Sequence, residues 1–336
     1  MFNQRLQDFT NSLHHLKVDP CLNPVLPIGW NPMTLKLALH IKKEASKAAG
    51  QKFNCYVLPF IPAPEKFYEK FIESIINYAN IVVPPGKTER IQIILGQGIP
   101  KVSRDTKHWV VMDLALSAKN IEIFYIDPAS FYDPKHLYDY QQHFLQELWL
   151  GLLRSGKQST LYYLNCRKAK IQAAKHNCAV FALDIASVLA TLDVTQCLAS
   201  YSKNTWHEFL PDTLPTGLVK ILRSLQPTNS FSDKYYGCFK DVLVSKKNSS
   251  DTIKLYDYVL QRDQKYKKPQ IDKHYQGILY LKEKYQEKIK NYLDEVLKDT
   301  KKLNDLSMYL DNLDWSKLAI YGLEPDIVAQ LSKVKL

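Results

Sequence analysis

Residues 178–192 form an almost wholly apolar segment, CAVFALDIASVLATL, which constrains the fold more than any other feature of the sequence. A helix that is apolar on all sides must be surrounded by other parts of the protein. The segment is too short to cross a membrane, and the chain has no run of about 18 apolar residues that would do so. We therefore predict that residues 178–192 form the central, buried helix of a globular protein.

Segments with strand and helix patterns precede this apolar segment. Short runs rich in β-branched and aromatic residues predict strands at 91–95, 109–114, 121–126 and 161–165, with a hairpin turn at 117–120. Apolar residues at helical spacing predict helices at 33–49, 64–79 and 136–154. Gly50 and Gly156 are suited to end the first and the last of these helices.

The C-terminal part of the chain has a different character. The net charge of the 336-residue chain is +11, and residues 216–302 hold 19 Lys and Arg against 11 Asp and Glu. A long amphipathic helix is predicted at 272–302, followed by two short helices that break between Gly322 and Pro325. We divide the chain into an N-terminal helical flank, a core and a basic, mainly helical C-terminal region, at 1–85, 86–215 and 216–336. Wrapping of the C-terminal region back onto the core is an equal alternative.

The basic balance favours an anionic partner. The run KYKKP at 265–269 interleaves Tyr with Lys, as nucleic-acid-binding segments do. Glu and Asp are mixed through the helix that follows, however, so a solvated helix face, or one that packs on a partner, is favoured. We therefore do not expect the protein to bind nucleic acid.

Several other classes of site are disfavoured by the sequence. The six cysteines are scattered with no CxxC pair, which is typical of free thiols in a reducing compartment. No Cys/His pair has the spacing of zinc ligands, so we expect no metal site. The two common nucleotide-binding fingerprints, GxGxxG and GxxxxGK[ST], are absent, and the N-terminus lacks the layout of a signal peptide.

Three polar residues stand at the ends of predicted elements. His108 immediately precedes one strand, Asp127 follows another, and Cys178 begins the apolar helix. The helix dipole and free backbone N–H groups stabilise a thiolate at a helix N-terminus, and a neighbouring imidazole stabilises it further. A carboxylate behind the imidazole fixes its tautomer and orientation. His108, Asp127 and Cys178 therefore predict a Cys–His–Asp nucleophilic triad.

Gln172 adds a fourth member to this group. It lies six residues before Cys178, where its side-chain amide would donate a hydrogen bond to the oxyanion of a tetrahedral intermediate. The backbone N–H of Cys178 would be the second donor.

Other residues compete for these roles. Taken alone, Cys178 is a buried free cysteine of a common kind, and Asp127 is a turn former. His176 is a rival base, but a residue two positions before Cys178 does not face it on a helix. Asp113 and Asp133 are rival acids that we interpret as solvated strand or loop residues, and Cys166 is interpreted as structural.

The order His, carboxylate, Gln, Cys resembles that of clan CE thiol enzymes, which include the ubiquitin-like-protein proteases and the YopJ-type bacterial effector acetyltransferases. The resemblance rests on HWVVMDL, FYIDPASF and IQAAKHNCAVFAL, and it covers about residues 90–215. The His108–Trp109 pair looks like the proteases, whereas Pro-Ala after Asp127 looks like the YopJ type. Two positions depart from the pattern: Ala179 stands in place of the usual Gly, and Asp127 in place of the Glu usual in the YopJ type.

The resemblance implies an α+β fold with a mixed central sheet, flanking helices, a surface groove and a helical C-terminal extension. In the protease type, the groove admits the Gly-Gly tail of a modifier, Trp109 would cover that tail, and no cofactor is needed. In the YopJ type, the same Cys takes an acetyl group from acetyl-CoA and passes it to Ser, Thr or Lys. Inositol hexakisphosphate in a basic pocket activates these enzymes, and the Lys residues after residue 215 would supply that pocket.

Our first hypothesis is a thiol isopeptidase that removes ubiquitin or a ubiquitin-like modifier from host or effector proteins. Cys178 attacks the last carbonyl of the tail, His108 moves the proton, Asp127 orients His108 and Gln172 holds the oxyanion. The alternative is a YopJ-like acetyltransferase with the same triad, and a third hypothesis is a non-catalytic binding module. The resemblance also implies a bacterial effector that works in the host cytosol.

Overall fold

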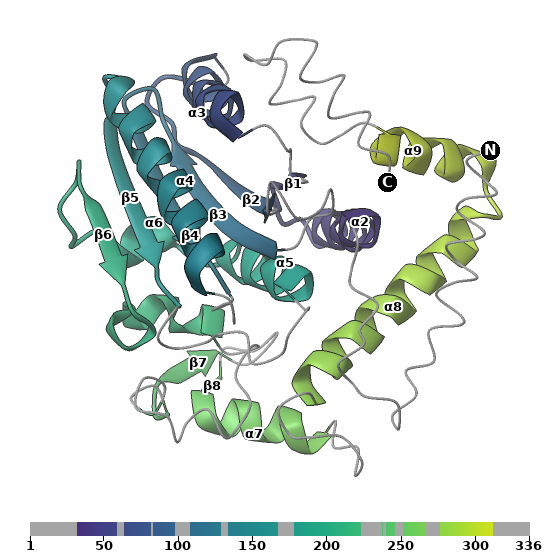
Figure 1. Ribbon diagram of the computed structural model, residues 1–336. Coiled ribbons are helices and arrows are strands. Elements are labelled where there is room, and N and C mark those ends of the chain that lie inside the picture. Colours follow the sequence, from purple (N-terminus) through teal and green to yellow (C-terminus); the bar gives the residue numbers. More distant parts are fainter. Residues whose placement is uncertain are drawn as a thin grey trace.

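The computed structural model describes residues 32–58, 64–81, 83–97, 108–128, 134–166, 178–222, 237, 240–245, 251–265 and 276–311. Within these residues, a six-stranded mixed sheet lies between two helical layers (Figure 1). The predicted α+β class with a mixed central sheet is confirmed.

The strands of the central sheet follow their order in the chain: β1 (Cys55–Leu58), β2 (Glu89–Gln97), β3 (His108–Leu116), β4 (Asn120–Ile126), β5 (Gln158–Leu164) and β6 (Trp206–Phe209). The central strands β2, β3 and β4 pair antiparallel, and the outer pairs are parallel. The predicted hairpin turn joins β3 to β4, where the Asn120 amide donates to the Ser117 hydroxyl at 2.8 Å. The four predicted strands are present, and the short edge strands β1 and β6 are additional.

The described helices are α2 (Pro32–Ala48), α3 (Pro64–Ile81), α4 (Pro134–Arg154), α5 (Cys178–Leu189), α6 (Val194–Cys197), α7 (Leu255–Lys265), α8 (Gln276–Val296) and α9 (Thr300–Asp311). Two 3-10 helices, η1 (Pro211–Thr213) and η2 (Thr216–Leu222), and a small hairpin of β7 (Leu243–Ser245) and β8 (Thr252–Lys254) complete the fold. Gly50 and Gly156 adopt φ values of +67° and +71° after α2 and α4, as their predicted stop positions require. None of the helices described is long and apolar enough to cross a membrane.

Alternating side chains of the sheet build two separate cores. One core lies under α3 and α4, and the other lies under α5 (Figure 1). Ten of the twelve residues of α5 are buried. The predicted central buried helix is therefore confirmed. Outside the sheet it packs against α2 and η2, and α8 packs on α2 in the same buried cluster.

The C-terminal helices share their core with α5. Tyr285, Ile289 and Val296 of α8 are buried in the same cluster as the apolar residues of α5. The contact between α8 and α2 also includes a hydrogen-bonding contact of 2.8 Å between His40 Nε2 and the Tyr292 hydroxyl. The C-terminal part wraps back onto the sheet domain. The division at residue 215 therefore marks a change in sequence composition, and its role as a domain boundary stays a prediction.

The prediction of a single helix over 272–302 is wrong in one respect. The helix ends at Val296, and α9 begins at Thr300. Between them, Asp299 Oδ1 accepts hydrogen bonds from the backbone amides of Lys301 at 2.9 Å and Lys302 at 3.2 Å. This is the N-cap arrangement, in which a short acidic side chain accepts hydrogen bonds from backbone amides that have no carbonyl partner in the first turn of a helix. The two short helices predicted around Gly322 and Pro325 lie outside the described residues.

Replacing the cap should destabilise α9 and its packing. We expect Asp299→Ala to lower the free energy of unfolding by about 1 kcal/mol, because two backbone amides lose their acceptor. Urea unfolding of the whole chain measures this change. The exposed Asp305→Ala on the same helix is the matched control and should stay within about 0.5 kcal/mol of the wild type. Equal effects of the two substitutions would contradict the capping role.

Candidate active site

The three residues of the predicted triad meet at one end of the central sheet. His108 is the first residue of β3, Asp127 directly follows β4, and Cys178 is the first residue of α5. Val111 pairs with Ile126 in antiparallel register, so the next position along β4, Asp127, lies opposite Val110. His108 is two residues before Val110 and therefore lies on the same face of the sheet, diagonal to Asp127. The antiparallel register of β3 and β4 therefore brings the imidazole and the carboxylate together.

The contact between His108 and Asp127 is short and buried. His108 Nε2 donates to Asp127 Oδ1 at 2.7 Å. His108 is 1% exposed, Asp127 is 4% exposed and Cys178 is 7% exposed. With Nε2 directed at the carboxylate, Nδ1 is the ring nitrogen left to exchange a proton with the thiol.

The charge of His108 follows from these neighbours. Burial lowers the pKa of the imidazole, but the charge of Asp127, its hydrogen bond, and the hydrogen bond and charge of Cys178 together raise the pKa to about 10. The imidazole is therefore protonated at neutral pH. An imidazolium beside a thiol favours the thiolate, which is the nucleophilic form. The position of Cys178 at the start of α5 adds the free amides and the positive end of the helix dipole.

The remaining residues of the predicted site are distributed differently. Trp109 is buried in the same core as α5. Its role in covering a substrate tail stays a prediction. Gln172, His176 and Asp133 lie outside the described residues, so the oxyanion role of Gln172 also stays a prediction.

Asp113 is not the solvated residue that the sequence suggested. It is 3% exposed, and it accepts hydrogen bonds from Arg90 Nε at 3.0 and 2.9 Å and from Gln92 Nε2 at 2.6 Å. Arg90 Nη2 lies 2.8 Å from the same carboxylate. Burial raises the pKa of Asp113, and Arg90 and Gln92 oppose that rise. The prediction failed because both partners lie on the neighbouring strand β2, about 20 residues earlier in the sequence.

The cysteines and acidic residues do not form a second site in the described parts of the chain. Cys55, Cys166, Cys178 and Cys197 are thiols outside any disulfide, as predicted. Cys166 is buried next to β5, which agrees with its structural interpretation. Among the residues described, no group of three or more His, Cys, Asp or Glu side chains is arranged to hold a metal ion.

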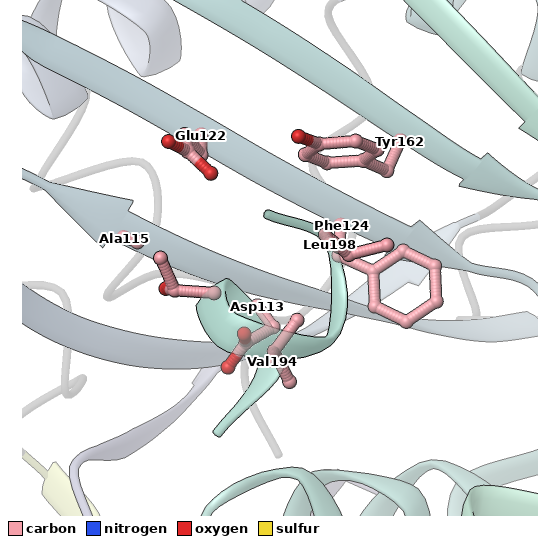
Figure 2. A pocket seen from close by; sticks show the side chains of 8 residues that line it. Asp113, Ala115, Glu122, Phe124, Tyr162, Val194 and Leu198 are labelled. Carbon is pink, nitrogen blue, oxygen red and sulfur yellow. The ribbon is translucent and has the colours of Figure 1, made fainter. Parts of the chain in front are cut away.

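A small pocket lies on the α5 side of the sheet, away from the triad. Figure 2 shows its lining, which includes Asp113, Glu122 and Tyr162 from the strands and Val194 and Leu198 from α6 and its C-terminal end. Its volume is about 10 Å³, which is room for about one water molecule. A pocket of this size is too small for a substrate.

Three solved structures are similar to this chain at low identity. The crystal structure of HopZ1a in complex with IP6 is 14% identical, covers 86% of this chain and 90% of that chain, and has a TM-score of 0.45. The structure of HopZ1a in complex with IP6 and CoA is 13% identical, covers 86% of this chain and 98% of that chain, and has a TM-score of 0.48. The structure of AvrA delL154 with IP6 and CoA is 15% identical, covers 84% of this chain and 98% of that chain, and has a TM-score of 0.48. A comparison with curated proteins finds no match.

The protonation of His108 should link stability to pH. Its pKa is raised from 6.5 to about 10 in the folded protein, so the folded state binds the proton more tightly than the unfolded state. The stabilising contribution is complete below pH 6.5 and is lost as the pH rises towards 10. We expect the free energy of unfolding of the wild type, relative to His108→Asn, to fall steadily over this range in urea titrations. A relative stability that stays flat or rises with pH would contradict the charged pair.

The family of the chain follows from its sequence profile. The profile that describes the YopJ serine/threonine acetyltransferases matches residues 37–275, which is more than half of the 336-residue chain. The matched range contains His108, Asp127, Gln172 and Cys178, and it extends from α2 to beyond the end of α7. The chain therefore belongs to the YopJ serine/threonine acetyltransferase family.

Proposed function

We propose that this protein is an acetyltransferase that moves an acetyl group from acetyl-CoA to a Ser, Thr or Lys side chain through Cys178. The observation that carries the proposal is the buried contact of His108 with Asp127 beside a thiol at a helix N-terminus. The family match supports acetyl transfer as the chemistry of this triad. The isopeptidase hypothesis uses the same residues, and the family match favours the acetyltransferase over it.

The first half-reaction loads the enzyme. The Cys178 thiolate attacks the thioester carbonyl of acetyl-CoA, and the carbonyl oxygen becomes an oxyanion. The backbone N–H of Cys178 and the side chain of Gln172 would hold this oxyanion. When the tetrahedral species collapses, the bond to the CoA sulfur breaks and His108 protonates the leaving CoA thiolate. The products are free CoA and an acetyl thioester on Cys178.

The second half-reaction transfers the acetyl group. His108, now neutral, takes the proton from the acceptor hydroxyl or amine as its oxygen or nitrogen attacks the thioester on Cys178. The Cys178 thiolate leaves, and the thiolate–imidazolium pair is restored. Asp127 holds the imidazole in one orientation throughout, through its contact with Nε2.

We propose that inositol hexakisphosphate binds to the basic helices and activates the enzyme, as the family resemblance implies. Described lysines on these helices include Lys42 and Lys43 on α2 and Lys288 and Lys290 on α8. These two helices touch each other, since Lys42 lies over the ring of Tyr285 at 5.3 Å. Lys42 also donates to the Ser187 hydroxyl of α5 at 2.6 Å, which connects this donor set to the helix of Cys178.

We also propose that the protein acts as a bacterial effector in the host cytosol. The family match supports the effector class, and the cytosol of a host cell supplies both acetyl-CoA and protein acceptors. The other partner of the enzyme is the protein that accepts the acetyl group.

The acetyl-enzyme is the species that tests the proposal. We expect wild-type protein incubated with acetyl-CoA and inositol hexakisphosphate to carry one acetyl group on Cys178, seen by intact mass and peptide mapping. Cys178→Ala should carry none, while Cys166→Ala, a matched change at another buried cysteine, should load normally. Asp127→Asn should lower the loading rate by about 10³- to 10⁴-fold, because the imidazole loses its orienting partner.

A ubiquitin probe with a C-terminal electrophile separates the two enzyme hypotheses. The acetyltransferase should leave this probe unreacted while it loads acetyl groups. Labelling of Cys178 by the ubiquitin probe, with no acetyl-enzyme, would overturn the proposal in favour of the isopeptidase. A chain that does neither would be a binding module.

Binding of inositol hexakisphosphate should stabilise the fold. At a hundredfold excess over its dissociation constant, a ligand of the folded state adds about 2.7 kcal/mol to the free energy of unfolding. We expect a rise in the unfolding temperature that shrinks with added salt, because the contacts are ionic. The double variant Lys42→Gln/Lys43→Gln should lose most of this rise, whereas the exposed Lys119→Gln in the β3–β4 turn should keep it. An unchanged rise in the double variant would exclude α2 from the binding site.

A further inference from the structure

A polar cluster of the buried Asp113 and the partly exposed Arg90 ties the turn after α5 to the sheet. Arg90, which already holds the Asp113 carboxylate through Nε and Nη2, donates from Nη1 to the backbone carbonyl of Leu192. The turn at 190–192 continues α5, since Leu192 N donates to the Leu189 carbonyl at 3.0 Å. Arg90 therefore binds a carbonyl of the turn that directly follows α5.

A directional contact of this kind is needed because the rest of α5 is apolar. Ten of its twelve residues are buried, and its face on the sheet meets side chains such as Val111 and Ile94. Apolar contact is non-directional, so a small shift of the helix along the sheet loses little buried area. The charge-assisted hydrogen bonds of a planar guanidinium, by contrast, fix both distance and angle. Arg90 is therefore suited to set the position of α5 along its axis.

One strand serves both ends of this helix. β3 begins with His108, which faces Cys178 at the start of α5, and it carries Asp113 five residues further on. Helix α5 rises about 17 Å from Cys178 to Leu189, and the turn at 190–192 follows it. Five residues of strand span about 17 Å, and the Arg90 side chain reaches the turn that follows the helix. Figure 2 shows Asp113 turned from the sheet towards Val194 of α6, the segment that follows α5.

We propose that Arg90 is a positioning residue for the nucleophile: by bridging Asp113 and the Leu192 carbonyl, it fixes α5 along β3 and so keeps the Cys178 thiol within reach of His108. The inference rests on the proposed function in one respect, namely that Cys178 is the nucleophile. It adds a residue on β2 that touches neither the substrate nor the reacting atoms.

Two variants remove the bridge in different ways. Arg90→Lys keeps a positive charge beside Asp113 but lacks the guanidinium fork, so a single ammonium group does not hold the carboxylate and the carbonyl together in the same geometry. The double variant Arg90→Met/Asp113→Leu replaces the ion pair by apolar side chains and leaves no buried charge without its partner. The second variant keeps the test open if the first does not fold.

A core substitution elsewhere controls for general loss of stability. Leu148 on α4 is fully buried in the core on the opposite face of the sheet from α5. Leu148→Ala leaves a cavity there and does not touch the attachment of α5. A merely structural role for Arg90 would make its variants behave like Leu148→Ala.

The rate of alkylation of Cys178 by iodoacetamide reports the thiol–imidazole pairing directly. It is followed by peptide mass spectrometry over a range of pH, at a temperature where each variant is folded. His108→Asn defines the rate without pairing. We expect both Arg90 variants to slow alkylation at neutral pH by on the order of tenfold, within the hundredfold that a displacement of about 1 Å can cost. Leu148→Ala should keep the wild-type profile.

Loading of Cys178 with acetyl groups from acetyl-CoA supplies the second readout. The Arg90 variants should show a lower loading rate at saturating acetyl-CoA, with an unchanged half-saturating concentration, because the binding surface for acetyl-CoA is kept and the thiol is misplaced. Wild-type rates of alkylation and loading in both folded Arg90 variants, or an equal loss in Leu148→Ala, would overturn the inference while leaving the acetyltransferase intact. If His108→Asn alkylates as fast as the wild type, the inference and the proposed function fail together.

Discussion

Burial of α5 between the sheet and the elements that pack on its other side is the constraint on which the rest of the structure depends. The helix is apolar on all sides, so both faces must be covered, and the sheet covers one of them. Outside the sheet, α5 packs against α2 from the N-terminal part and η2 from the start of the C-terminal part, and α8 packs on α2 in the same buried cluster. The two flanks that differ in composition from the core therefore join the core that buries the helix beginning at Cys178.

Much of this arrangement was predictable from the sequence, because the strong signals are local. The apolar pattern of 178–192, the strands around His108 and Asp127, and the glycines at positions 50 and 156 each act through neighbouring residues. The short edge strands β1 and β6 were missed because four residues carry too little periodicity. Asp113 was misjudged for a different reason: its burial depends on Arg90 and Gln92, and nothing within β3 reveals the pairing of two strands that are far apart in sequence.

The predicted triad shows the same division between local and long-range information. Strand ends and a helix start suggested His108, Asp127 and Cys178, and the register of β3 with β4 brings the first two into contact. The choice between hydrolysis and acetyl transfer has another origin. Both reactions pass through an acyl thioester on the same sulfur, so the triad specifies the nucleophile, and the surfaces that admit donor and acceptor specify the reaction. The family profile extends beyond the core into α2 and α7.

The contact between His40 and Tyr292 joins residues that are 252 positions apart. Loop closure over such a separation comes late in folding, because its entropic cost must be met before the contact contributes. During synthesis, α2 emerges first and has to wait for α8, since domains assemble as the chain leaves the ribosome. The contact between α2 and α8 thus forms only after residue 292 has been made, which gives a ribosome-bound fragment that contains α2 and Cys178 but lacks α8.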